Sequence, residues 1–223
     1  MLVEDAWVVV PLYNEAAVVG DVVAGLRRSF AHVVCVDDAS RDGSGEVAER
    51  AGARVVRHPV NLGQGAALQT GLDWALADPA CRFVVTFDAD GQHQVADALA
   101  MVERLRAGEA DVVIGSRFLD RRTRVGALKK AVLRAGIVYS NATTGVRMTD
   151  AHNGLRAMTR AVAESLDITQ NRMAHASEIV EQVGRGDWRW VEHPVEILYT
   201  DYSVKKGQSV LNSVNIVTEL IFK

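Results

Sequence analysis

Hydrophobic and polar positions alternate in blocks along the first half of the chain. Apolar runs of strand length are separated by segments long enough for helices. We expect strands at residues 6–12, 33–36, 53–56, 83–87 and 112–114. We expect helices between them at residues 16–28, 44–51, 64–77 and 95–106. This alternation predicts a parallel sheet with helices on both faces, and the continuous apolar runs fit strands that are covered on both sides.

The pattern changes after residue 115. Residues 121–130 carry five Arg and Lys side chains. Beyond them the pattern predicts helices at residues 127–141 and 175–184, a strand at 188–199 and an amphipathic helix at 209–222. There is no internal repeat and no low-complexity linker, so we expect residues 1–223 to form a single domain.

Composition narrows the possible classes of function. The 223 residues carry a net charge of −3, which gives no reason to expect nucleic-acid binding. The two cysteines, Cys35 and Cys81, form neither a disulfide framework nor a zinc set. The sequence shows no signal peptide and no apolar stretch long enough to span a bilayer. We therefore expect a cytoplasmic protein whose contact with a membrane, if any, is peripheral.

Two carboxylates follow the predicted strand at residues 83–87, in the segment Phe87-Asp88-Ala89-Asp90-Gly91-Gln92-His93. In an open α/β sheet, ligands bind outside the carboxyl ends of the strands. Oxygen ligands in such a place suit Mg²⁺ or Mn²⁺ bridged to a diphosphate. We expect Asp90 to be the principal metal ligand, with Asp88 and Gln92 beside it. A solvated acidic turn is the simpler alternative.

A second acidic segment, Val36-Asp37-Asp38-Ala39-Ser40-Arg41-Asp42-Gly43-Ser44, follows the predicted strand at residues 33–36. Its spacing nearly fits an EF-hand calcium loop, but that loop needs a helix before it and here a strand precedes. We expect Asp38 instead to hydrogen-bond a nucleotide base or ribose. The residues after it predict a turn that leads into the next helix.

The segment Pro11-Leu12-Tyr13-Asn14-Glu15 ends the first predicted strand. Pro11 stops the hydrogen-bond ladder, and Asn14 is of a type that caps the helix expected next. Glu15 would then lie at the edge of the sheet where a nucleotide sits, so a base or ribose contact is expected there.

Two further strand ends carry weaker signals. The segment Asn61-Leu62-Gly63-Gln64-Gly65-Ala66-Ala67 lacks the third glycine of a dinucleotide fingerprint, because Leu68 stands in its place. We expect Gly63 and Gly65 to let the backbone approach a nucleotide or sugar. Gly115-Ser116-Arg117 closes the next strand, where Arg117 could bind a phosphate or pair with a carboxylate such as Asp120.

Taken in order, these segments resemble the motifs of the inverting family-two glycosyltransferases, and most of all those of the dolichyl- and polyprenyl-phosphate sugar synthases. The first four lie within residues 8–93. The second half matches more loosely. Residues 150–156 resemble the family's Asp-x-x-x-Gly-Phe-Arg, with Leu155 for Phe, and residues 192–195 resemble its Glu-Val-Pro-Val. Residues 199–209 resemble its closing Arg-x-x-Gly-x-Ser-Lys, while its C-terminal transmembrane helices have no counterpart here.

The resemblance implies an α/β fold of the GT-A type, a mostly parallel central sheet flanked by helices. Residues 1–117 would bind the nucleotide sugar, and residues 118–223 would form an acceptor-side α/β portion. The nucleoside would be held by Pro11, Tyr13, Glu15, Asp37 and Asp38. The metal motif would be Asp88 and Asp90 with Gln92 beside them, and Arg117 would hold a phosphate. The candidates for the lipid-phosphate contact are Lys129, Lys130, Arg134 and Arg156.

The predicted reaction is metal-dependent, inverting transfer of a sugar from a UDP- or GDP-sugar to a polyprenyl or dolichyl phosphate. Such a phosphate needs no strong general base, because its second pKa is about 6. An alcohol acceptor would need one, and Asp150 is then the candidate. The alternatives are an acceptor that is a polysaccharide, a protein or a small alcohol, a nucleotidyltransferase, and a non-catalytic sensor of sugar nucleotides.

Two segments of the second half bear on membrane contact. The basic residues 121–130 could meet anionic headgroups, or form a solvated loop. The helix expected at residues 209–222 carries an apolar stripe, which could pack in the core or dock on a membrane or a small membrane-protein partner.

Overall fold

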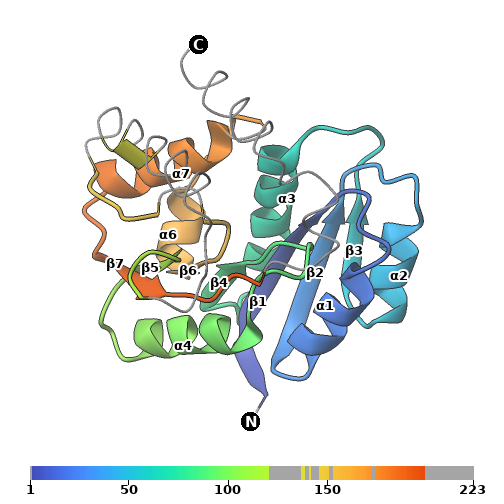
Figure 1. Cartoon of the computed structure of the whole chain (residues 1–223), viewed down its shortest axis with the longest axis horizontal. Coiled ribbons are helices and arrows are strands. Elements are labelled where there is room, and N and C mark those ends of the chain that lie inside the picture. Colours follow the sequence, from blue (N-terminus) through green and yellow to red (C-terminus); the bar gives the residue numbers. More distant parts are fainter. Residues whose placement is uncertain are drawn as a thin grey trace.

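The computed structural model describes residues 2–120, 137–138, 141, 146–150, 153–171 and 174–198. Each element expected in the first half is present, with bounds that differ by a few residues (Figure 1). The strands are β1 (Val3–Leu12), β2 (Phe30–Asp37), β3 (Arg54–Arg57), β4 (Phe83–Thr86) and β5 (Val112–Ser116). The helices are α1 (Val19–Arg27), α2 (Ser44–Arg50), α3 (Gln64–Leu76) and α4 (Val95–Arg106).

The described part of the second half adds two elements that the sequence pattern did not predict, β6 (Arg156–Thr159) and α6 (Arg160–Ser165). The helix expected at residues 175–184 is confirmed as α7 (Ala174–Arg185). The strand expected at residues 188–199 is shorter, as β7 (Trp190–Pro194). Of the helix expected at 127–141, only residues 137, 138 and 141 are described, and they are helical. The helix expected at 209–222 lies outside the described residues.

The described strands form one seven-stranded sheet in the order β3-β2-β1-β4-β6-β5-β7. β1 runs parallel to β2 and β4, and β5 runs parallel to β7. β6 is inserted between β4 and β5 and runs antiparallel to both. The sheet is therefore mostly parallel, as expected, and its one reversed strand brings residues just before Arg156 to the edge where β4 ends.

Alternate residues of the central strands pack into two separate hydrophobic cores. Val8 and Val10 of β1 pack with α1, α2 and α4, whereas Val9 between them packs with α3, α6 and α7. Figure 1 shows these two sets of helices on opposite faces of the sheet. Both faces are thus covered, which explains why the strands read as unbroken apolar runs.

The parallel strands end together at one edge of the sheet. Leu12 of β1 is in register with Asp37 of β2, and Val9 is in register with Thr86 of β4. The polar segments that follow these three strands therefore meet at one place. No helix within the described ranges is both long enough and apolar enough to cross a bilayer.

Candidate active site

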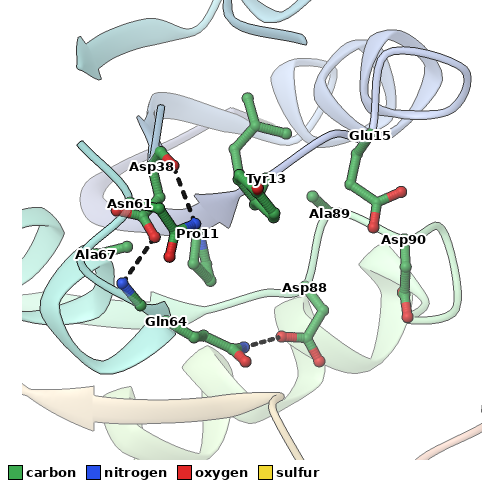
Figure 2. Close-up of a pocket in the computed structure, with 12 residues that line it drawn as sticks. Pro11, Tyr13, Glu15, Asp38, Asn61, Gln64, Ala67, Asp88, Ala89 and Asp90 are labelled. Carbon is green, nitrogen blue, oxygen red and sulfur yellow. Dashed lines mark hydrogen bonds between the residues drawn. The ribbon is translucent and has the colours of Figure 1, made fainter. Parts of the chain in front are cut away.

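A cavity of about 430 Å³ opens where the loops after β1, β2 and β4 meet. Figure 2 shows its polar residues at two ends: Asp38 and Asn61 lie at one end, and Glu15 and Asp90 at the other. Seven of the residues expected to bind nucleotide or metal line it. They are Pro11, Tyr13, Glu15, Asp38, Gly63, Asp88 and Asp90. The remaining lining residues are Leu12, Asn61, Gln64, Ala67 and Ala89.

The loop after β1 is fastened to the loop after β2. The backbone N–H groups of Asn14 and Glu15 donate to the hydroxyl oxygens of Ser40 and Ser44, at 3.0 and 2.7 Å. Asn14 adopts a positive φ of 52°, and its side chain accepts from the backbone of Arg41. Asn14 therefore does not cap α1, which begins at Val19, and the expected cap is wrong. Its cross-link instead holds Glu15 at the cavity.

The two adjacent aspartates after β2 face different surroundings. Asp38 lines the cavity, and its carboxylate accepts the backbone N–H groups of Leu62 and Gly63, both at 2.8 Å. Asp37 is not among the lining residues. Its Oδ1 accepts the backbone N–H of Ser40, and its Oδ2 lies only 2.5 Å from where a methyl group on Gly45 would stand. Asp37 thus packs against the start of α2, and its predicted contact with a nucleoside finds no support in this position.

The Asp88 carboxylate is held on both oxygens. His93 Nε2 lies 2.9 Å from Oδ2, and Gln64 Nε2 donates to Oδ1 at 3.3 Å. Loss of water around Asp88 would by itself raise the pKa of this carboxyl. The hydrogen bond from His93 and the positive charge of Arg156 outweigh that effect and hold the pKa below its usual value. Asp88 is therefore a fixed carboxylate that stays ionised.

The pKa of Asp90 is shifted in the opposite direction from that of Asp88. Burial, together with the negative charge of Asp88, raises the pKa of Asp90 to about 6, and the charge of Glu15 adds to this. The carboxylates of Glu15 and Asp90 lie on the same side of the cavity in Figure 2. Negative charge gathered in this way is relieved when a cation binds.

The residues present fit a shared cation better than a complete protein cage. The described residues contain no group of three or more His, Cys, Asp or Glu side chains that could hold a metal ion on its own. Mg²⁺ commonly takes one or two carboxylates and completes its shell with water and substrate phosphates. Asp88 and Asp90 supply such a pair at the wall of a cavity large enough for a ligand.

The model of the glycosyl transferase family 2 matches residues 7–166, which is most of the chain. This chain belongs to that family. It is 32% identical to the uncharacterized protein MJ1222 of Methanocaldococcus jannaschii, over 99% of this chain and 92% of that protein. It is 31% identical to an undecaprenyl-phosphate mannosyltransferase of Micrococcus luteus, over 92% of this chain and 90% of that enzyme.

A solved structure with the same fold is glucosyl-3-phosphoglycerate synthase of Mycobacterium tuberculosis, in complex with Mn²⁺, UDP and glucosyl-3-phosphoglycerate. The match has a TM-score of 0.65 at 19% identity and covers 96% of this chain and 79% of that one. The expected GT-A fold and the resemblance to family-two enzymes are therefore confirmed, and the protein is a glycosyltransferase.

Arg117 of this glycosyltransferase is held by Asp150 and does not line the cavity. Its Nε donates to Asp150 Oδ2 at 2.6 Å, and Nη2 donates to Oδ1 at 3.1 Å. The side chains of Arg117 and Asp150 are 13% and 1% exposed. The alternative that Arg117 pairs with a carboxylate is confirmed, and that carboxylate is Asp150. Neither phosphate binding by Arg117 nor a general-base role for Asp150 is supported by this geometry.

The turn that carries Asp150 is fixed by the strand next to β5. Glu192 of β7 accepts hydrogen bonds from the backbone N–H groups of Thr149 and Asp150, at 2.8 and 3.2 Å. Glu192 belongs to the segment that resembles the family's Glu-Val-Pro-Val. In this chain its carboxylate holds the turn on which the Arg117 partner stands.

Other predicted site residues do not line the cavity, or lie outside the described residues. Gln92 is buried, and its backbone N–H donates to Asp90 Oδ1, but it is not among the lining residues. Gly65 is also absent from the lining, because the backbone of Gln170 crosses close over it. Arg156 is only 1% exposed, which argues against the predicted contact with an acceptor phosphate. Lys129, Lys130 and Arg134 lie outside the described residues.

Three residues that sequence reasoning did not assign a role help to position Asp88. Gln64 and His93 bind its carboxylate, and the backbone of Gly154 lies directly beside it. His93 stands in the same segment as Asp88 and could have been found from that proximity. Gly154 could not, because it comes to Asp88 only through the antiparallel pairing of β6 with β4.

Proposed function

We propose that this glycosyltransferase transfers a sugar, with inversion, from a UDP- or GDP-sugar to a polyprenyl or dolichyl phosphate, and that it needs Mg²⁺ or Mn²⁺. The observation that carries the proposal is the meeting of Glu15, Asp88 and Asp90 at one cavity that also holds Asp38. The carboxylates that line this cavity would repel a diphosphate. A donor with a diphosphate therefore fits this cavity only together with a divalent cation.

Asp88 and Asp90 have different roles in this proposal. Asp88 is fixed by His93 and Gln64, so it presents an oxygen in a set position. Asp90 has a raised pKa and gives up its proton when a cation competes for it. A bound divalent cation would supply charge stabilisation to the diphosphate as it leaves. The relative from M. tuberculosis was solved with Mn²⁺ and UDP, which supports the same pairing here.

The reaction proceeds by one displacement at the anomeric carbon. An oxygen of the acceptor phosphate forms the new bond to that carbon. The bond from the carbon to the donor diphosphate breaks, and its electron pair leaves with the nucleoside diphosphate. A single displacement inverts the anomeric configuration. The acceptor oxygen is already ionised near neutral pH, so no general base is needed.

The surroundings of Asp150 favour a phosphate acceptor over an alcohol. Asp150, the candidate base for an alcohol acceptor, is buried and has both oxygens bound by Arg117. The M. luteus relative is named for transfer to undecaprenyl phosphate, which is the same acceptor class. A lipid phosphate therefore accounts for the described residues with fewer assumptions than an alcohol does.

A transfer assay with matched acceptors tests the proposal. The purified protein is given Mn²⁺, a labelled UDP- or GDP-sugar, and either polyprenyl phosphate, the corresponding polyprenol or no lipid. We expect label in the lipid phase only when polyprenyl phosphate and metal are both present. Equal transfer to the polyprenol would contradict a phosphate acceptor, and transfer only to a soluble alcohol or glycan would favour the alternative acceptors.

A further inference from the structure

The carboxylate of Asp38 is almost completely used by the protein itself. Oδ1 accepts the backbone N–H of Leu62 at 2.8 Å and also contacts Nδ1 of His58 at 2.8 Å. Oδ2 accepts the backbone N–H of Gly63 at 2.8 Å. The side chains of His58 and Asp38 are only 8% and 4% exposed. This set of contacts fixes the loop before α3 against the end of β2.

The direction of the His58 hydrogen bonds follows from chemistry. An ionised carboxylate only accepts, so Nδ1 of His58 donates to Asp38. Nε2 lies 3.0 Å from the hydroxyl oxygen of Thr70 on α3, which anchors the other side of the ring. The backbone N–H of His58 also donates to the carbonyl of Asp37 at 2.9 Å. Both nitrogens of the ring are therefore held, and the backbone of His58 is fixed as well.

A carboxylate offers about four acceptor positions, two on each oxygen. His58 and Leu62 use the two on Oδ1, and Gly63 uses one on Oδ2. One position remains, and it belongs to a residue that lines the cavity. Asp38 can therefore accept one further hydrogen bond from a ligand.

The four bases make different demands on such a site. Uracil presents a single ring N–H between two carbonyl oxygens. Guanine presents a ring N–H and an adjacent amino group, which pair best with a carboxylate whose two oxygens are both open. Cytosine and adenine present a ring nitrogen that accepts, and this faces a carboxylate unfavourably. One open acceptor suits uracil and leaves part of the guanine edge unpaired.

Tyr13 also supports placing the base beside Asp38. It lines the cavity and is 47% exposed, and an aromatic ring in such a place can stack on a base. Figure 2 places Tyr13 between Asp38 and the carboxylates of Glu15 and Asp90. A nucleotide laid along the cavity would have its base near Asp38 and its diphosphate near Asp90.

We infer that the donor is a uridine diphosphate sugar and that His58 sets this choice, because its ring occupies the oxygen of Asp38 that guanine would need. His58 is a positioning residue that acts through Asp38. The inference rests on the proposed function, since it assigns the nucleoside of the same donor.

Equilibrium binding of UDP, GDP and CDP to the purified protein in Mn²⁺ tests this inference. We expect UDP to bind about tenfold or more tightly than GDP and CDP, the discrimination typical of one buried hydrogen bond left unpaired. GDP binding as tightly as UDP to the unaltered protein would overturn the inference. This comparison needs no variant and so does not depend on a mutant that folds.

Two substitutions of His58 separate specificity from simple support of the fold. His58→Leu opens Oδ1, so the ratio of UDP to GDP affinity should fall toward one. His58→Asn keeps an N–H donor near Asp38, so the ratio should be restored. Thr70→Val removes the hydrogen bond at Nε2 of His58 but not the donor at Nδ1 that binds Asp38, so it is the matched control and should keep the preference. A His58→Leu variant that folds and discriminates as before would overturn the role of His58.

The outcomes distinguish this inference from the proposed function. Transfer from GDP-sugars but not from UDP-sugars would keep the glycosyltransferase and overturn the choice of uridine. Preferential UDP binding without transfer to polyprenyl phosphate would keep the choice of uridine and contradict the proposed acceptor. Failure to bind any of the three nucleotides would contradict both.

Discussion

Gly154 leaves the space that Asp88 occupies. A methyl group built on Gly154 would lie 2.1 Å from Oδ2 of Asp88. The backbone of Gly154 is fixed there, because its carbonyl accepts the hydroxyl of Thr86 at 2.7 Å. Any side chain at residue 154 must therefore displace the carboxylate from its contact with His93.

The first prediction concerns this close approach. Gly154→Ala should weaken Mn²⁺-dependent donor binding by about tenfold or more, since a displaced ligand costs roughly a charge-assisted hydrogen bond. The fold should persist, because the displaced group is the end of a side chain. Titration of donor against the variant in Mn²⁺, beside its thermal melt, measures both effects.

A matched glycine serves as control for that prediction. A methyl group at Gly25 on α1 would meet Val95 at 3.8 Å, which is an ordinary contact. Gly25→Ala should leave donor binding unchanged. Unaltered donor binding by Gly154→Ala would show that Asp88 is not needed in its observed position.

The second prediction concerns the ion pair of Arg117 and Asp150. Asp150→Asn should reduce the free energy of unfolding by about 3 kcal/mol, because it removes the buried negative charge that two nitrogens of the largely buried Arg117 bind. Urea denaturation measures this loss. If Asp150 only holds Arg117, the pH profile of the residual transfer activity should keep its shape.

A different outcome would restore the general-base role of Asp150. That role requires a fully stable Asp150→Asn variant whose activity is lost and whose acidic limb in the pH profile disappears. A double-mutant cycle with Arg117→Met adds a second measure. The two substitutions should be strongly non-additive if the residues act as one pair.

The third prediction follows from the raised pKa of Asp90. A cation must displace the proton from this carboxyl, whose pKa is raised to about 6. Affinity for Mn²⁺ should therefore be constant above about pH 6 and fall by up to about tenfold for each pH unit below it. Electron paramagnetic resonance of free Mn²⁺, measured without nucleotide, follows this directly.

Ionisation of Asp90 also changes the free energy of unfolding, in the opposite direction from ionisation of a carboxylate in a salt bridge. Folded Asp90 holds its proton more tightly than the unfolded chain, whose ordinary value is 3.8. Its ionisation therefore destabilises the metal-free fold as the pH rises through about 6. Asp90→Asn should remove both this effect and the pH dependence of Mn²⁺ binding. A variant that keeps the same pH dependence would assign it to another group.

The part of the site that follows parallel strands could be predicted from sequence. Strand length and alternation gave β1, β2 and β4, and the carboxyl ends of parallel strands meet at one edge. Glu15, Asp38, Asp88 and Asp90 therefore come together in the cavity as expected. Because these side chains are carboxylates, they indicated the binding of a divalent cation and a nucleotide.

Contacts that depend on tertiary pairing could not be predicted in the same way. The partner of Arg117 stands 33 residues further along the chain and is brought close by the turn that Glu192 holds. β6 is four residues long and gives no periodic signal, yet it carries Gly154 to Asp88. His58 belongs to none of the motifs, and only the folded chain shows that it binds Asp38.

The central claim is that the donor is cleaved in the cavity lined by Glu15, Asp88 and Asp90. The most direct test measures the release of nucleoside diphosphate from a UDP- or GDP-sugar in the presence of polyprenyl phosphate. The unaltered protein should release the nucleoside diphosphate only with Mn²⁺ or Mg²⁺. Asp90→Asn should lose activity by about a hundredfold or more, as expected when transition-state charge loses its stabilisation. An Asp90→Asn enzyme as active as the unaltered protein, or full activity in a chelator, would contradict a metal-dependent reaction at this site.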